Sequence, residues 1–150
     1  MTKRECKDCI AESITTGRDA PYPGPRCTSH HRARKKQLSQ ASREKRWASV
    51  YSITGEQYAA ILESQGGTCA WCGRANGRTK ALAVDHDHAC CDGPTSCGEC
   101  VRGLLCSPCN VHLGYLRDSI EAAERLVKYL KSPPARAVLW DWDDFEPPEE

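Results

Sequence analysis

Cysteine is the residue that most constrains how this chain can fold. The 150 residues include eleven cysteines but only one phenylalanine and one methionine. Most of the cysteines form Cys-x-x-Cys pairs, namely Cys6 with Cys9, Cys69 with Cys72, Cys97 with Cys100, and Cys106 with Cys109. A short loop of this kind lets two thiolates bind one Zn²⁺ ion. With so few large apolar side chains to bury, the chain is expected to fold around bound zinc.

The two central pairs flank a segment in which aspartate and histidine alternate, Asp85-His86-Asp87-His88. Together they supply the four thiolates of a closed tetrahedral site: Cys69, Cys72, Cys106 and Cys109. Gly73 follows the first pair and suits the unusual backbone angles of such a loop. We expect this zinc to be structural, which leaves the aspartates and histidines for chemistry.

The N-terminal pair predicts a second zinc site of the Cys₃His type. Its ligands would be Cys6, Cys9, Cys27 and one of two adjacent histidines, His30 or His31. The two-residue gap after Cys27 favours His30. The alternative is an arm with free thiols, which does not explain the paired spacing at both ends.

A third cysteine group lies between the two central pairs: Cys90, Cys91, Cys97 and Cys100. A zinc site here would bring every cysteine of the chain into one of three sites. Adjacent ligands at Cys90 and Cys91 are geometrically awkward, so free or redox-active thiols are the alternative.

The sequence offers no sign of a membrane or a secretory route. No apolar run approaches the ~20 residues that span a bilayer, and the N-terminus lacks an apolar signal region. We therefore expect a protein of the reducing cytoplasm with no membrane partner, where paired cysteines favour zinc over disulfides.

Charge is unevenly distributed although the net charge is only +1. The segment from His31 to Trp47 contains one acid, Glu44, against many bases: Arg32, Arg34, Lys35, Lys36, Arg43, Lys45 and Arg46. It lacks Gly and Pro, which predicts a helix that binds DNA phosphates, a solvated helix face being the alternative. Residues 141–150 carry acids without a single base, and we expect the tail from residue 135 to be disordered.

Local patterns predict the remaining elements. Thr54 and Gln57 have the spacing of a capping box that begins a helix, and Gly66-Gly67 would end it. Strands are expected over residues 80–86 and 101–105, and a short helix over 108–116. A capped helix follows from Asp118 to Leu130, with Ile120, Ala123, Val127 and Leu130 on one face. That face would pack on the protein core or pair with a second subunit.

The motifs taken together resemble a known family. The run from Gln65-Gly66-Gly67 to Cys109-Asn110 contains Val-Asp-His-Asp-His and Val-Arg-Gly-Leu-Leu-Cys-x-x-Cys-Asn. It resembles the bacteriophage recombination endonuclease VII family, one of the HNH or ββα-metal nucleases. The resemblance implies a small zinc-stabilised α+β fold, in which a strand, a strand and a helix form the nuclease core.

The resemblance also implies roles for individual residues. Asp85 and Asn110 would bind a catalytic Mg²⁺, for which Mn²⁺ is the alternative, and His86 would be the general base. His88 would orient or stabilise the phosphate, and Arg102 would clamp a neighbouring one. In a regular strand Asp85 and His86 point to opposite faces, so the strand must bend or end there.

These expectations divide the chain into five parts. They are an N-terminal zinc knuckle (1–31), a basic and a capped helix (32–66), the nuclease core (67–117), a C-terminal helix (118–132) and an acidic tail (133–150). The expected function is Mg²⁺-dependent hydrolysis of DNA by a phage enzyme of recombination, junction resolution or genome packaging. Expected partners are branched or junction DNA, with a second copy of the chain and phage packaging proteins as further candidates. The alternative is a non-catalytic zinc-ribbon adaptor or regulator that binds DNA.

Overall fold

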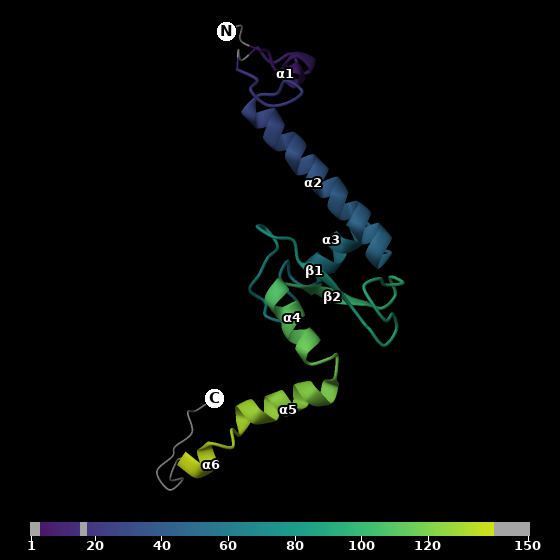
Figure 1. The fold of residues 1–150 in the computed structure, drawn as a ribbon, viewed down its shortest axis with the longest axis vertical. Coiled ribbons are helices and arrows are strands. Elements are labelled where there is room, and N and C mark those ends of the chain that lie inside the picture. Colours follow the sequence, from purple (N-terminus) through teal and green to yellow (C-terminus); the bar gives the residue numbers. More distant parts are fainter. Residues whose placement is uncertain (1–3, 16–17, 140–150) are drawn as a thin grey trace. The chain divides into compact units, whose positions relative to one another are not determined.

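A two-stranded sheet and a series of helices make up the computed structural model, which describes residues 4–15 and 18–139 (Figure 1). The elements follow the chain in this order: α1 (Lys7–Ala11), α2 (Thr28–Tyr51), α3 (Gly55–Ser64), β1 (Ala83–His86), β2 (Val101–Leu105), α4 (Ser107–Tyr115), α5 (Ile120–Lys131) and α6 (Arg136–Leu139). The expected small α+β class is confirmed. No helix within the described ranges combines the length and the apolar character needed to cross a membrane.

Contacts between Cα atoms divide the chain into two compact units. One consists of Met1–Ile61 with Pro94–Glu99, and the other of Leu62–Gly93 with Cys100–Glu150. The five-part division expected from the sequence stays a prediction.

Helix α2 dominates the first unit. It spans 24 residues and begins directly after Cys27, so it extends beyond the predicted basic helix at both ends. Trp47 is the only residue of α2 that is buried, and its ring stacks on Tyr58 of α3 with 3.8 Å between the ring centroids. Ser52 ends α2 in the left-handed conformation, with φ of 54°. Most other residues of α2 are exposed to solvent.

The start of α3 has the predicted capping box. The Thr54 backbone N–H donates to Gln57 Oε1 at 2.7 Å, and the Gln57 backbone N–H donates to Thr54 Oγ1 at 3.1 Å. Beyond the other end, Gly66 and Gly67 both have positive φ, and their N–H groups bind the carbonyls of Glu63 and Leu62. The reciprocal pairing of Thr54 and Gln57 satisfies backbone N–H donors that the first turn of a helix leaves without partners.

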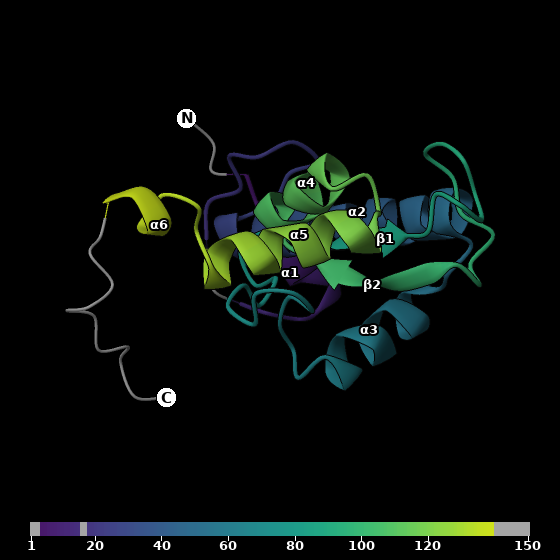
Figure 2. The same cartoon turned by 90° about the horizontal axis from the view of Figure 1, so that it is seen from below.

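In the second unit β1 pairs with β2 as an antiparallel hairpin, and α4 packs against β1 (Figures 1 and 2). The register opposes Asp85 to Gly103 and His86 to Val101, with a bulge between Asp85 and His86. β1 is shorter than the predicted strand, beginning at Ala83. A strand, a strand and a helix thus follow one another in the expected order.

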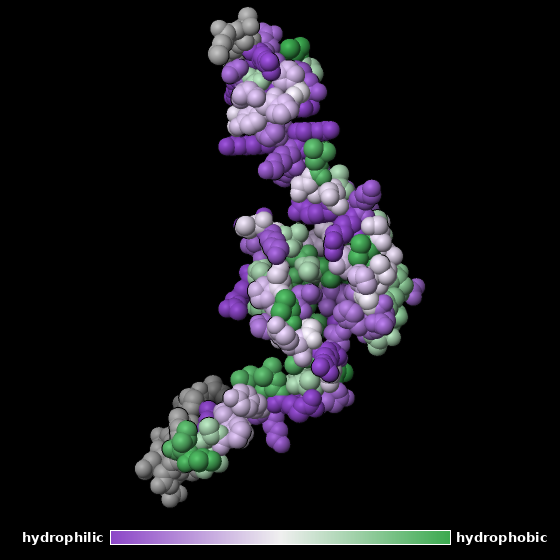
Figure 3. Space-filling view, in the orientation of Figure 1, coloured by the Kyte–Doolittle hydropathy of each residue, from purple (hydrophilic) through white to green (hydrophobic). Residues whose placement is uncertain are grey.

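The C-terminal helix α5 is capped by Ser119, whose side chain accepts from the Ala122 backbone N–H at 3.1 Å. None of its residues is buried, and Ile120 and Leu130 are 72% and 64% exposed. Figure 3 shows the resulting hydrophobic surface along this helix. Among the described residues nothing covers the apolar face, so the expected packing on the core is not found.

The segment expected to be disordered contains α6, which covers Arg136–Leu139. The remainder of the predicted acidic tail, residues 140–150, lies outside the described residues.

Candidate metal centres and catalytic site

The central cysteines converge on one point of the second unit. Cys69 and Cys72 come from the loop after α3, Cys106 is the N-cap of α4, and Cys109 lies in its first turns. All four sulfur atoms lie within 4.8 Å of one another, and those of Cys72 and Cys106 are 3.9 Å apart. A tetrahedron with Zn–S bonds of about 2.3 Å has sulfur–sulfur edges of about 3.8 Å. The four thiols therefore fit a zinc ion.

Backbone amides and burial act on these thiols in opposite directions. Hydrogen bonds from the backbone of Arg74 and Ala75 lower the pKa of Cys72 to about 6. Burial, followed by the neighbouring sulfurs, raises the pKa of Cys109 to about 12. Zinc binds all four ligands as thiolates, so its binding must displace the protons that the thiols carry.

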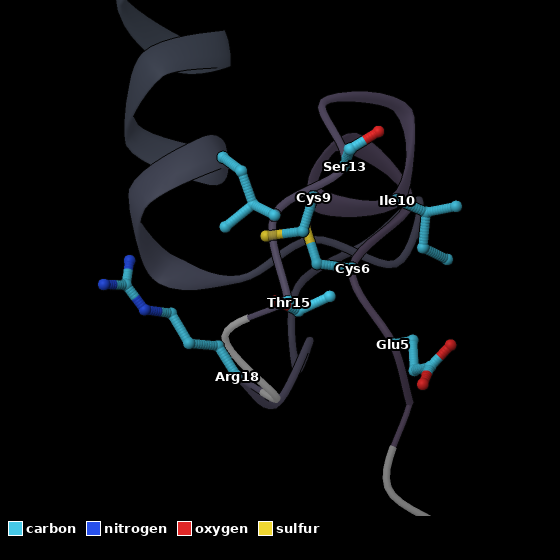
Figure 4. A pocket seen from close by; sticks show the side chains of 8 residues that line it. Glu5, Cys6, Cys9, Ile10, Ser13, Thr15 and Arg18 are labelled. Atoms are coloured by element: carbon cyan, nitrogen blue, oxygen red, sulfur yellow. The ribbon is translucent and has the colours of Figure 1, made fainter.

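The N-terminal cluster has the same geometry with one imidazole. Cys6, Cys9 and Cys27 are buried, and the sulfurs of Cys9 and Cys27 are 3.9 Å apart. His30 Nδ1 lies 3.3 to 3.4 Å from the three sulfur atoms. Figure 4 shows the sulfur atoms of Cys6 and Cys9 side by side in this small space. These contacts match the edges of a Cys₃His tetrahedron.

The structure distinguishes the two adjacent histidines. His30 turns Nδ1 toward the cysteines and Nε2 toward Glu12 Oε2, 3.0 Å away. His31 instead stacks on Tyr22, with 4.2 Å between ring centroids. A carboxylate on the distal nitrogen is the usual partner of a metal-binding histidine. No sequence pattern predicts this role for Glu12, because a single acid in a loop has no distinguishing pattern.

The third cysteine group also comes together. One ligand atom from each of Cys90, Cys91, Cys97 and Cys100 lies within 4.8 Å of the others. Cys90 and Cys91 are both in a turn in which their N–H groups donate to the Asp87 carbonyl. The described residues thus contain three possible zinc sites, and no disulfide forms among them.

Asp85 and His86 are both buried although they are neighbours in a strand, with 8% and 6% of their surface exposed. The pairing register shifts between them, because Asp85 opposes Gly103 and His86 opposes Val101, which leaves Arg102 of β2 as the extra residue of the bulge. β1 ends at His86, which is one of the two possibilities that the sequence left open. Two polar side chains buried at a strand end are typical of a functional site.

The two histidines of the motif lie next to each other. Their ring centroids are 4.6 Å apart, and His86 Nε2 lies 3.2 Å from the Gly93 carbonyl oxygen. A carbonyl only accepts, so Nε2 is the donor in this contact. Asp87 plays a local role, since its Oδ1 accepts from the Ala89 backbone N–H.

Asn110 lies on α4, the helix that packs on the strand carrying Asp85. Beside Asp85 there is a hollow of about 290 Å³, lined also by Arg102, Gly103 and Leu113. Asp85 and Asn110 thus come from elements in contact, and of the two only Asp85 lines the hollow.

Arg102 pairs with two carboxylates of this site. Its Nε and Nη2 donate to the two carboxylate oxygens of Asp85, at 2.7 and 3.1 Å. Nη2 also donates to Asp118 Oδ1 at 2.7 Å. Hydrogen bonds to Asp85, opposed by burial and aided by Asp118, raise the pKa of Arg102. The sequence analysis assigned no site role to Asp118.

The predicted DNA-binding residues of α2 lie along a largely exposed helix. Arg43 is half-buried and donates to Gln40 Oε1 at 3.0 Å. The others are exposed: Arg32, Arg34, Lys35, Lys36, Lys45 and Arg46. The helix surface drawn in Figure 3 is accordingly mainly hydrophilic.

The family model for recombination endonuclease VII matches residues 44–132, more than half of the chain. The chain belongs to this family. It is 49% identical to the Gene 59 protein of Mycobacterium phage D29 over 138 residues, covering 91% of this chain and 79% of the relative. The Gene 59 protein of Mycobacterium phage L5 is 47% identical over the same coverage.

Membership of the endonuclease VII family implies a phage nuclease whose substrate is DNA. The matched region contains the central cysteines, Asp85, His86 and Asn110. The N-terminal cysteine cluster and most of α2 precede it.

Proposed function

We propose that the protein is a Mg²⁺-dependent DNA endonuclease of the HNH type, with residues 67–117 as its nuclease core. The observation that carries this proposal is the burial of Asp85 and His86 together at a bulged strand end. A structural zinc ribbon needs neither group, because its four cysteines already close the metal site.

The ligands for Mg²⁺ would be Asp85 and Asn110, which offer the oxygen atoms that this ion prefers. Arg102 occupies one lone pair on each Asp85 oxygen, whereas a carboxylate has about four such sites. The residues present therefore fit the ion, with Mn²⁺ as the alternative. Bound there, the ion would neutralise charge that grows on the phosphate and the leaving oxygen.

His86 is the proposed general base. The Gly93 carbonyl accepts from Nε2 and orients the ring, and the imidazole would take a proton from the attacking water.

His88 and Arg102 supply the positive or hydrogen-bonding groups near the phosphate. His88 is half exposed and lies beside the His86 ring, so it can contact the phosphate that the activated water attacks. Arg102 keeps a positive charge next to Asp85 and limits the repulsion between this carboxylate and DNA.

The zinc clusters and α2 would form the scaffold and the DNA-holding surface. Two or three structural Zn²⁺ ions hold the loops, and the basic side chains of α2 attract phosphates without reading sequence. The proposed substrates are four-way junctions or other branched DNA, in recombination, junction resolution or genome packaging. A homodimer would present two such sites to a junction.

A cleavage assay with Mg²⁺ tests the proposal on junction, flap, nicked and linear duplex DNA. We expect cleavage by the parent and a loss of roughly 10²- to 10⁴-fold for His86→Ala, the usual contribution of a general base. Zinc content, thermal melting and DNA affinity should stay at the parental values. Asn110→Asp should bind Mg²⁺ more tightly and turn over more slowly, because it keeps an oxygen and adds charge.

Cys106→Ser is the matched architectural variant, and it should lose zinc, fold and activity together. Parental cleavage by His86→Ala would overturn the assignment of the motif. A parent that binds DNA but cuts none of the four substrates would instead favour the adaptor.

A further inference from the structure

The turn between α4 and α5 holds an aspartate in an unusual backbone conformation. Arg117 and Asp118 have φ of 51° and 55°, both in the left-handed region. Residues other than glycine rarely adopt this backbone conformation, although aspartate tolerates it better than most. Two such residues in succession are typical of a turn that places a particular side chain.

The two carboxylate oxygens of Asp118 have different partners. Oδ1 accepts from Arg102 Nη2 and Oδ2 binds His88 Nδ1, each at 2.7 Å. The side chain is 18% exposed, whereas that of His88 is 54% exposed. Asp118 is therefore the more enclosed partner and anchors a histidine that solvent and substrate can reach.

The contact with Asp118 determines the tautomer of His88. Burial raises the pKa of Asp118, but hydrogen bonds from Arg102 and His88 lower it by more, so this pKa lies below the ordinary value. An ionised carboxylate only accepts, so the His88 proton is on Nδ1 and Nε2 is the nitrogen left for a substrate. A carboxylate that orients a histidine in this way fixes both ring angle and tautomer.

The same carboxylate connects to Asp85 through one guanidinium. Arg102 donates to both Asp85 oxygens and to Asp118, so it bridges two carboxylates. Loss of Asp118 would leave Arg102 with Asp85 alone and would release the His88 ring. Both proposed phosphate-binding groups thus depend on one residue outside the motif.

We propose that Asp118 is a positioning residue of the nuclease site, which orients His88 and Arg102 for the phosphate. This inference rests on the proposed function. Asp118 does not need to contact the substrate itself, because its effect passes through the two side chains that it holds.

Two substitutions at position 118 suit its backbone. Asp118→Gly removes both contacts without strain at a φ of 55°, and Asp118→Asn keeps one acceptor oxygen and loses the charge. Arg117→Gly is the matched control, since it changes the same turn at an exposed residue with the same backbone conformation. It should cleave at the parental rate.

We expect Asp118→Gly to lower kcat by about 10- to 100-fold, the usual cost of losing a group that orients a site histidine. Asp118→Asn should lie between Asp118→Gly and the parent, and zinc content should not change. In a His88→Ala background, Asp118→Gly should lower kcat by a smaller factor. Asp118 acts through His88 and Arg102, and the first of these contacts is already absent there. Parental kcat, or equal losses in both backgrounds, would overturn the proposal.

Nitrogen-15 spectra of the imidazole rings test the contact without any cleavage. The chain has five histidines, and His88→Ala identifies the signal of His88. The parent should show His88 protonated on Nδ1, and Asp118→Gly should shift it toward the other tautomer. A parent with His88 protonated on Nε2 alone would refute the assignment, even if a variant failed to fold. This readout stays decisive if the parent cuts no DNA, in which case only the proposed function fails.

Discussion

One polar side chain, that of Gln65, connects the loop after α3 to strand β2. Gln65 Nε2 donates to the carbonyls of Thr68 and Leu104, at 2.8 and 3.0 Å, and Gln65 Oε1 accepts from the Leu104 backbone N–H at 2.8 Å. Leu104 is completely buried, so water cannot replace this partner. Gly103 leaves room for the amide, since a Cβ there would lie 3.1 Å from Gln65 Oε1.

Replacing Gln65 should therefore destabilise the hairpin. In Gln65→Ala the buried Leu104 amide loses its acceptor, which costs about 1–3 kcal/mol. We expect a melting temperature lower by at least about 4 °C and faster hydrogen exchange at Leu104, with unchanged zinc content. Gln37→Ala, on the exposed face of α2, is the control. Equal melting of the two variants would show that the Gln65 bonds contribute nothing.

Residues of this kind mark the limit of prediction from the sequence. The cysteine spacings and the Thr54–Gln57 box are local patterns, and the structure brings their residues together as expected. Asp118, by contrast, contacts His88, which lies 30 positions away in the chain, and no periodic pattern predicts such a contact. Asp118 was assigned only to the helix start, where Ser119 is the actual cap.

Helix α2 keeps its basic residues in solvent and has few partners of its own. A helix of 24 residues with one buried side chain depends on its ends, the Cys27 and His30 cluster at the start and Trp47 against Tyr58 near the finish. Charge on such a helix is available to a polyanion along its length. The alternative, a solvated face, predicts no effect on DNA binding.

Neutralising part of α2 separates these two interpretations. A triple variant that combines Arg34→Gln, Lys35→Gln and Lys36→Gln should bind DNA more weakly. Its plot of log affinity against log salt concentration should also be less steep, by up to about 2.7 in slope if each residue contacts one phosphate. The control is the same triple change on exposed α5, at Arg125, Lys128 and Lys131. Anisotropy measured in the His86→Ala background avoids cleavage. If both triple variants show the parental slope, α2 is a solvated helix.

The exposed stripe on α5 shows a second limit of sequence analysis. Its periodicity correctly indicated an amphipathic helix, but periodicity does not say what covers the apolar face. Val127 remains half exposed in the structure. A pairing partner would have to be found by measurement of the oligomeric state.

At the scale of the whole molecule, thiols are a large part of the described core, since Cys6, Cys9, Cys27, Cys69 and Cys109 are all buried. In the first unit a cluster of buried core residues consists of Cys6, Cys9, Cys27 and Ala20. We expect the purified protein to hold at least two zinc ions through dialysis, and to unfold when a chelator removes them. The variants Cys9→Ser, Cys109→Ser and Cys97→Ser each disrupt one cluster. Elemental analysis of their zinc content should therefore assign one ion to each site that stays intact. One zinc ion or none in the parent would contradict the N-terminal assignment.

A core made of three cysteines and one alanine also changes what drives folding. Such a core buries little hydrocarbon, so collapse in water supplies little free energy before a metal arrives. With zinc as its ligand, each site adds about 1.4 kcal/mol of stability for every tenfold rise in free zinc above its dissociation constant. Folding of a newly made chain into its working form would then depend on the free zinc concentration in the infected cell more than on the temperature.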